Sequence, residues 1–238
     1  MIRHLLKFLT AILLFTAVSD SASAHAIWIE TSANGVKGKP QQVKVFFGEY
    51  TKANRDTVAR WYSDINKLSL WVTQPGKPEK QLQLTDSVDF YAASFTPDAD
   101  GVYTLVIRHP LKDLFRTYKL EYNAMAPVWV GAKSVTATPV KADITLTTPA
   151  NQFKQNEKIA LVVHFEGKVL PEQEVEIVSP TGKKETVKTN KSGALEFIPT
   201  ESGRYLTEVI YRNKVAGTHN GKAFDTHMKI ATLNIPVL

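Results

Sequence analysis

The sequence predicts an all-β protein built from two consecutive β-sandwich domains. Three observations lead to this fold class. Apolar and polar residues alternate with period two along most of the chain after residue 24. The alternating segments are short and rich in Val, Ile, Thr and aromatic residues. Gly, Pro, Asn and Asp separate these segments, as expected for turns between strands.

Residues 1–24 have the three parts of a secretion signal, namely a positively charged start, an apolar run at 8–18 and the small-residue site Ala22-Ser23-Ala24. The apolar run of 11 residues is shorter than the roughly 20 that a transmembrane helix needs. The chain has no cysteine that could carry a lipid. We therefore expect cleavage after Ala24, export to the periplasm and a mature chain without a membrane anchor.

The composition describes a chain that must be stabilised by its core. With Cys 0, the mature chain of 214 residues has no disulfide, and this length buries enough apolar surface for one or two domains. The formal net charge is +6, and removal of Arg3, Lys7 and Asp20 with the signal makes it +5. The Lys and Arg residues are scattered and form no basic run with interleaved aromatics, so nucleic acid is not an expected partner.

The first domain is expected to span 25–130 and to begin with an antiparallel pair of strands. Segments 25–30 and 42–47 form this pair, and Asn34-Gly35 punctuates the connection between them. Further strands are expected at 68–73, 80–84, 89–95 and 102–108. The polar stretch 51–66 is expected to hold one short helix or an excursion over the barrel mouth.

The second domain is expected to span 140–238. A new unit begins after Met125-Ala126-Pro127, and 135–139 is the expected connector. Seven short strands are expected at 144–147, 158–165, 174–178, 186–189, 194–198, 204–211 and 229–235. Their number and spacing are typical of an immunoglobulin-like or prealbumin-like sandwich, the architecture expected for both domains. Such modules are usually scaffolds, so this half of the sequence does not by itself indicate a biochemical activity.

Cleavage after Ala24 would make His25 the first residue of the mature protein. A terminal histidine carries a free α-amine beside its imidazole, and the two can close a chelate ring on one metal ion. Neutral imidazole suits Cu, Ni, Zn and Fe, and an α-amine loses its proton at about pH 8 in model peptides. The alternative is that the peptidase simply leaves a histidine at this position.

The strand pairing predicts a carboxylate beside this terminus. If 25–30 pairs antiparallel with 42–47 through a symmetric connection, the numbers of cross-strand partners add to about 74, which brings His25 opposite Glu49. Glu49 is therefore a candidate ligand. The alternative is that Glu49 forms a salt bridge with the free α-ammonium group.

Three further histidines are candidate ligands. His109 ends a predicted strand at a rim where ligands can converge, although a rim histidine is more often merely solvated. His219 and His227 lie eight residues apart in an expected loop around Asp225. That loop either lends a ligand across a domain interface or is a solvent-exposed turn. His164 lies within a predicted strand and is expected to be a packing or surface residue.

Five motifs together resemble one family of bacterial periplasmic proteins. They are His25-Ala26-Ile27-Trp28-Ile29-Glu30, Val45-Phe46-Phe47-Gly48-Glu49-Tyr50, Thr189-Asn190-Lys191-Ser192-Gly193, Gly217 through Gly221-Lys222-Ala223-Phe224-Asp225, and Ala231-Thr232-Leu233. The likeness is to the proteins grouped as NikM-like or CbiK-like, and it covers nearly the whole mature chain. It implies an accessory protein of nickel or cobalt uptake that works with a transporter component in the inner or outer membrane.

One departure from the family pattern leaves the identity of the metal open. The nickel site of transporter subunits with this name places a histidine second after Met, whereas here histidine would be first and Ile27 third. Nickel, cobalt, copper and zinc therefore remain candidates. A site of amine, imidazole and carboxylate would favour copper in open competition.

The function expected from the sequence is binding of a divalent transition metal (Ni, Co or Cu) by a periplasmic accessory protein. The candidate ligands are His25, Glu49, His109, His219 and His227. No enzyme activity is expected, because the chain has no cysteine nucleophile, Gly-x-Ser-x-Gly elbow, His-Glu-x-x-His motif or phosphate loop. One alternative is an adhesion or assembly module that uses exposed edge strands. The other is a copper-dependent oxidase in which the terminal histidine and a second histidine hold the metal.

Overall fold

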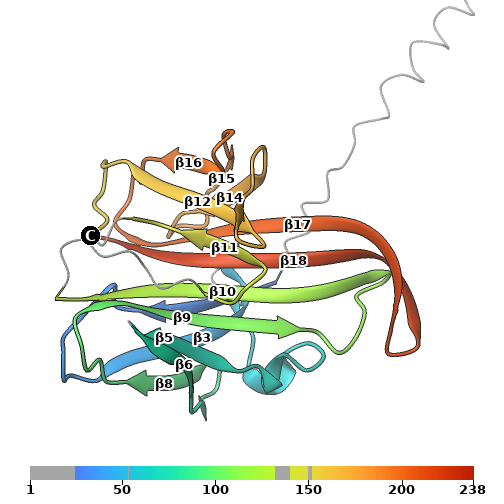
Figure 1. Ribbon diagram of the computed structural model, residues 1–238, viewed down its shortest axis with the longest axis horizontal. Helices are drawn as coiled ribbons and strands as arrows, with labels where there is room; N and C mark the ends of the chain where they lie inside the picture. The colour runs from blue at the N-terminus through green and yellow to red at the C-terminus, as the bar shows by residue number, and fades with distance from the viewer. Residues whose placement is uncertain (1–24, 53, 75, 132–139, 150–151) are drawn as a thin grey trace, which may run out of the picture.

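The chain folds almost entirely into β-strands, as predicted (Figure 1). The structure is a computed structural model that describes residues 25–52, 54–74, 76–131, 140–149 and 152–238. Within these ranges the strands form three sheets, and the helical residues are confined to three single 3-10 turns. The expected signal at 1–24 and the expected connector at 135–139 lie outside the described residues. No helix in the described part of the chain has the length and apolar character needed to cross a membrane.

The N-terminal sheet contains the first predicted strand pair. Its strand order is β1 (Ala26–Thr31), β3 (Gln41–Glu49), β8 (Tyr91–Phe95) and β7 (Thr85–Asp86), and the short strand β4 (Asn54–Arg55) also pairs with β3. The stretch expected to hold one short helix contains β4 and the 3-10 turns η1 (Tyr50–Lys52), η2 (Val58–Arg60) and η3 (Ile65–Lys67).

The central sheet contains nine strands from both halves of the sequence. Its order is β15 (Lys184–Lys188), β14 (Glu174–Val178), β17 (Gly203–His219), β18 (Lys222–Val237), β10 (Tyr118–Val130), β9 (Gly101–Pro110), β5 (Leu70–Gln74) and β6 (Lys77–Leu82), and β2 (Asn34–Gly35) pairs with β10. The C-terminal sheet consists of β11 (Ile144–Thr147), β12 (Ile159–Phe165), β13 (Lys168–Val169) and β16 (Ala194–Phe197).

The predicted register of the first strand pair is confirmed. Ala26 lies opposite Gly48 and Ile27 lies opposite Phe47, so the numbers of the partners add to 74. Continued by one residue, this register brings His25, which precedes β1, across from Glu49 at the end of β3. The position of the candidate terminus within the fold therefore follows directly from the sequence pattern.

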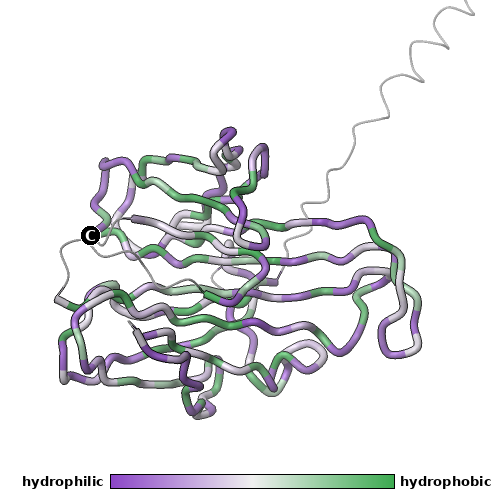
Figure 2. The backbone as a smooth tube through the Cα atoms, in the orientation of Figure 1, coloured by the Kyte–Doolittle hydropathy of each residue, from purple (hydrophilic) through white to green (hydrophobic). Residues whose placement is uncertain are grey.

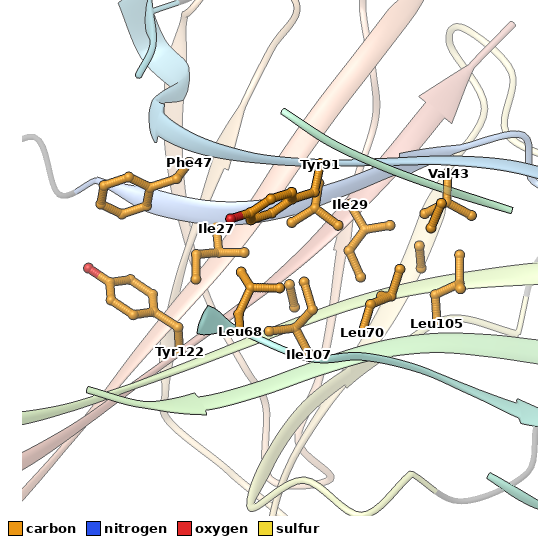
Figure 3. Packing of buried hydrophobic residues seen from close by; sticks show 14 of the residues in the cluster. Ile27, Ile29, Val43, Phe47, Leu68, Leu70, Tyr91, Leu105, Ile107 and Tyr122 are labelled. Atoms are coloured by element: carbon orange, nitrogen blue, oxygen red, sulfur yellow. The ribbon is translucent and has the colours of Figure 1, made fainter. Parts of the chain in front are cut away.

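Both faces of β1 are buried. Ile27 and Ile29 point into a core between the N-terminal sheet and the central sheet, where they face Leu105 and Ile107 of β9 (Figure 3). On the opposite face, Ala26 and Trp28 join a second cluster with Phe46, Val178 and Leu206. A strand with two buried faces has apolar residues at consecutive positions in its sequence. This explains why all four residues at 26–29 are apolar.

A third cluster lies on the opposite face of the central sheet, under the C-terminal sheet. It joins Val106 and Met125 of the first half to Leu161 and Val163 of β12. The central sheet therefore has a core on each face. Figure 2 shows that apolar residues recur along the strands, whereas the outlying turns are mainly hydrophilic.

The division into two consecutive sandwiches is not confirmed, because one sheet crosses the expected boundary. β10, from the first half, pairs in parallel with β18, from the second half, between Tyr118↔Thr226 and Met125↔Leu233. Met125-Ala126-Pro127, after which a new unit is expected to begin, lie inside β10, which ends at Val130. Pro127 sits where β10 exchanges its partner β18 for β2, a place where a missing N–H is tolerated.

The last two strands are much longer than predicted. β17 has 17 residues and β18 has 16, and together they form a hairpin that runs past the C-terminal sheet (Figure 1). Asn220 (φ 47°) and Gly221 (φ 78°) form its two-residue turn, in the left-handed region that such hairpins require. The segment expected to be a loop around Asp225 is therefore the end of a β-hairpin.

We predict that the shared sheet makes the protein unfold as one unit. Leu105 in β9 and Leu161 in β12 are both 0% exposed and lie in different cores. Replacing either one by Ala should cost roughly 2–5 kcal/mol, through lost burial and the cavity that remains. Calorimetry should show a single transition that both substitutions move to lower temperature. Two resolved transitions, each sensitive to only one substitution, would contradict the prediction.

Candidate metal centre

The imidazole of His25 lies against a carboxylate that the sequence analysis missed. Its Nε2 atom is 3.2 Å from Oδ2 of Asp56, with 42% of the His25 side chain and 25% of the Asp56 side chain exposed. The ring also packs 5.2 Å from the ring of Phe47. A carboxylate only accepts hydrogen bonds, so Nε2 is the nitrogen that would donate to Asp56, and in a neutral ring Nδ1 would then carry the lone pair.

Asp56 is held in place through its backbone. Its N–H donates to the carbonyl of Phe47 at 2.9 Å, and its own carbonyl accepts from the Trp61 indole at 2.9 Å. Trp61 is only 5% exposed and is packed in the core between the sheets. The carboxylate beside His25 is thus positioned by buried neighbours rather than by a free loop.

The backbone edge of β1 is anchored to the central sheet at alternate residues. The Tyr122 hydroxyl donates to the His25 carbonyl at 3.2 Å, and the Thr232 hydroxyl donates to the Ile27 carbonyl at 2.6 Å. Figure 3 shows Tyr122 facing Phe47 at this end of the core, with their ring centroids 6.1 Å apart. The backbone conformation of the first residues of β1 is therefore set by contacts with β10 and β18 of the central sheet.

Glu49, the predicted carboxylate, is directed toward a lysine. The register brings its backbone opposite His25, but its carboxylate lies 2.9 Å from Nζ of Lys52 and accepts from the Thr51 hydroxyl at 3.5 Å. The carboxylate that lies against the imidazole of His25 is that of Asp56. Asp56 follows β4, a two-residue strand that folds back onto the end of β3. The sequence carries no periodic signal for such a short strand.

His109 lies in a different place and has its own acidic partner. Its side chain is 10% exposed and its Nε2 atom is 3.4 Å from Oδ1 of Asp64. Burial alone would raise the pKa of the Asp64 carboxyl, but the N–H of Lys112 and the imidazole of His109 together hold this pKa below its usual value. His109 and Asp64 therefore form a structural contact between β9 and the segment before η3.

His219 and His227 occupy strands of the long hairpin rather than a loop. Nε2 of His219 is 2.9 Å from the carbonyl of Leu111 and holds the hairpin end against the segment after β9. His227 lies 3.6 Å from Glu121, and burial and the charge of Lys229 lower the pKa of its imidazole. Nζ of Lys229 is 3.2 Å from the same Glu121 oxygen, so an ammonium group already occupies the position that a cation would take.

The structure does not gather the five predicted ligands into one site. His25 and Glu49 lie at the same end of the N-terminal sheet, His109 and His219 lie beside the segment after β9, and His227 lies on β18. His164 is in β12, as predicted. In the described part of the chain, no group of three or more His, Asp or Glu side chains is arranged to hold a metal ion. Among the described side chains at the predicted terminus, the imidazole of His25 and the carboxylate of Asp56 are therefore the pair available to build a metal site.

Comparison with known proteins gives a family match. A family model described as "Domain of unknown function (DUF4198)" matches residues 22–213. No curated protein matches the chain. A solved structure from Corynebacterium diphtheriae, described as a candidate membrane-anchored protein, is 12% identical with a TM-score of 0.29 and covers 90% of this chain. The chain spans 60% of that protein's length, and at these values the likeness carries no argument.

We predict that Asp64 stabilises the fold in a pH-dependent way. Because folding lowers the pKa of this carboxyl, its contribution is present above the unfolded value of about 3.9 and is lost as the pH falls through the lower folded value. Asp64→Asn should lower Tm at pH 7, and the gap from the parent should shrink at pH 3. Asp113→Asn, in a neighbouring exposed carboxylate, is the control and should show no such narrowing. A gap for Asp64→Asn that is equal at both pH values would exclude this role.

Proposed function

The chain belongs to the family described as a domain of unknown function (DUF4198), and we propose a biochemical function for it from its own residues. The mature protein, starting at His25, binds a divalent transition-metal ion in the periplasm as an accessory protein of metal uptake. The ligands that begin the site are the α-amine and the imidazole of His25. The resemblance to NikM-like or CbiK-like proteins supports the role in uptake.

The contact between His25 and Asp56 is the observation that supports this proposal. An α-amine and Nδ1 of the same histidine close a six-membered ring on a metal, whereas Nε2 points away from that ring. When Nε2, which lies 3.2 Å from Asp56, donates to that carboxylate, Nδ1 is left as the ligand atom. A carboxylate behind a metal-binding imidazole fixes its tautomer and raises its basicity, and is a recurrent feature of metal sites in proteins.

The proposed site is open, which suits a protein that passes a metal on. His25 supplies two donors, so a four-coordinate ion keeps two further positions for water or for a ligand from a transporter component. The His25 side chain is 42% exposed, so such a partner has access to it. The donor set of amine and imidazole follows the general order of affinities, in which copper binds more tightly than nickel and nickel more tightly than cobalt.

The alternative of an adhesion module that adds strands at sheet edges has less support. The two edges of the central sheet, β6 and β15, carry the sequences Lys-Pro-Glu-Lys-Gln-Leu and Lys-Glu-Thr-Val-Lys. Lysine and proline on an edge strand prevent further strand pairing. The copper-oxidase alternative requires a second histidine beside His25, whereas the imidazole of His25 lies against the carboxylate of Asp56.

We predict that two changes at the terminus weaken metal binding. Extending the mature chain by one alanine converts the His25 amine into an amide without a basic lone pair, so Kd should rise at least tenfold, about 1.4 kcal/mol. Asp56→Asn should raise Kd roughly tenfold, since it removes the charge behind the imidazole. Isothermal titration with Ni²⁺ and with Cu²⁺ at pH 7 measures both effects.

Glu49→Gln and His227→Ala are the matched controls for these titrations. Glu49 neutralises Lys52 and His227 shares Glu121 with Lys229, so neither substitution should change Kd by more than about twofold. An unchanged Kd in the alanine-extended chain would show that the terminus is not a ligand. A large loss of affinity in Glu49→Gln would instead restore Glu49 as the carboxylate of the site.

A further inference from the structure

The far end of the β17–β18 hairpin is joined to two other segments of the chain. The N–H of Asp225 donates to the carbonyl of Thr117 at 3.1 Å, and the Tyr62 hydroxyl donates to the carbonyl of Leu114 at 3.2 Å. The turn of this hairpin projects away from the C-terminal sheet (Figure 1). These contacts create one composite surface, which we name the hairpin end and which consists of residues 62–64, 111–119 and 212–225.

Positive charge is concentrated at the hairpin end. Its 26 residues contain six Lys or Arg against three Asp, which gives +3 of the +5 expected for the mature chain of 214 residues. The six cations are Lys112, Arg116, Lys119, Arg212, Lys214 and Lys222, and all but Lys119 are exposed. None of the six forms an ion pair with a described residue, whereas ten Lys and Arg residues elsewhere do.

The three acids of the hairpin end accept hydrogen bonds from uncharged groups. Asp64 accepts from the N–H of Lys112 at 2.9 Å, Asp113 accepts from the Ser63 hydroxyl at 2.8 Å, and Asp225 accepts from the Thr226 hydroxyl at 2.9 Å. These contacts tie the segments together and do not engage the ammonium and guanidinium groups. The positive charge of this surface is therefore available to a partner outside the chain.

Exposed apolar side chains lie among these cations. Tyr62 is 42% exposed, Phe115 is 44% and Val215 is 43%, and these are three of the eight exposed large apolar residues in the described part of the chain. The rings of Tyr62 and Phe115 pack edge to face with their centroids 6.4 Å apart, and the Arg116 guanidinium lies 5.5 Å from the Phe115 ring. Aromatic rings together with Lys and Arg are the side chains that settle where lipid headgroups meet water.

We propose that the hairpin end binds the surface of a bilayer that contains anionic lipids. The unpaired ammonium and guanidinium groups attract lipid phosphates, and the exposed side chains of Tyr62, Phe115 and Val215 enter the headgroup region. The cations come from three segments and surround apolar side chains, an arrangement that fits an extended layer of anionic headgroups. The contact is reversible, because it combines surface charges with only a few apolar side chains.

This inference goes beyond the proposed metal function and does not rest on it. It uses neither the terminal amine nor the imidazole of His25. Membrane binding can therefore be measured in a buffer with a metal chelator, where failure of the metal proposal has no effect on the result.

Co-sedimentation of the chain starting at His25 with lipid vesicles tests the proposal. In about 0.05 M NaCl, the chain should bind vesicles of about one third phosphatidylglycerol in phosphatidylcholine at least about tenfold more tightly than vesicles of phosphatidylcholine alone. Raising NaCl to about 0.5 M should release it, because salt screens exposed charges. Equal binding to both kinds of vesicle would overturn the proposal. Binding to neither would also overturn it and would favour an acidic protein as the partner.

A pair of lysine substitutions locates the binding surface. Lys214→Gln combined with Lys222→Gln should weaken binding to the anionic vesicles at least about tenfold, because each Lys near an anionic surface strengthens binding several-fold. The matched control is Lys37→Gln combined with Lys39→Gln, in an exposed turn beside β2, which pairs with the opposite end of β10. The control should change binding by less than about twofold. Equal losses for the two pairs would show that net charge alone is sensed and would overturn the assignment of the surface.

The aromatic part of the surface has its own test. Phe115→Ala should weaken binding at least about threefold, because it removes apolar area that the headgroup region would cover. Val36→Ala, at a side chain that is 62% exposed beside β2, is the control and should leave binding unchanged. All the substituted side chains are exposed, so Tm should stay close to that of the parent. Unchanged binding for Phe115→Ala would overturn the insertion of the aromatic side chains.

Discussion

The parallel pairing of β10 with β18 is the constraint on which the rest of the structure depends. Each strand belongs to a different half of the sequence, and their ladder turns the two halves into one central sheet. Because this sheet has apolar residues on both faces, the N-terminal sheet covers one face and the C-terminal sheet covers the other. The same pairing places Tyr122 and Thr232 side by side with the start of β1, where they bind the carbonyls of His25 and Ile27.

The local structure was predictable from the sequence, whereas the connection between the halves was not. Period-two alternation identified most of the longer strands, with β10 as the main exception, and a symmetric connection was enough to predict the register of β1 on β3. β10 was not predicted, because it contains Pro127 and a proline usually ends a strand. In the structure, Pro127 lies where the strand that neighbours β10 changes from β18 to β2. Parallel pairing over a separation of more than 100 residues leaves no pattern in a single sequence, so the shared sheet could not be foreseen.

The candidate site was predictable only as far as backbone register extends. Register placed Glu49 across from His25, but it says nothing about side-chain direction, and Lys52 three residues later attracts the Glu49 carboxylate. Asp56 reaches His25 because β4 turns back onto β3 for just two residues and Trp61 then fixes the Asp56 carbonyl. Such short irregular segments depend on tertiary contacts, which is why the expected cleavage site pointed to His25 whereas strand periodicity missed Asp56.

The surroundings of His25 come from segments far apart in the chain. Asp56, beside the N-terminal sheet, lies 3.2 Å from its imidazole, and Tyr122 of the central sheet donates to its carbonyl. Thr232 of the same sheet holds the carbonyl of Ile27, two residues later. A side chain that is 42% exposed is therefore carried on a backbone that the core fixes in place. In the proposed site, this arrangement keeps the donor atoms of His25 in a defined position while a partner still has access to the metal.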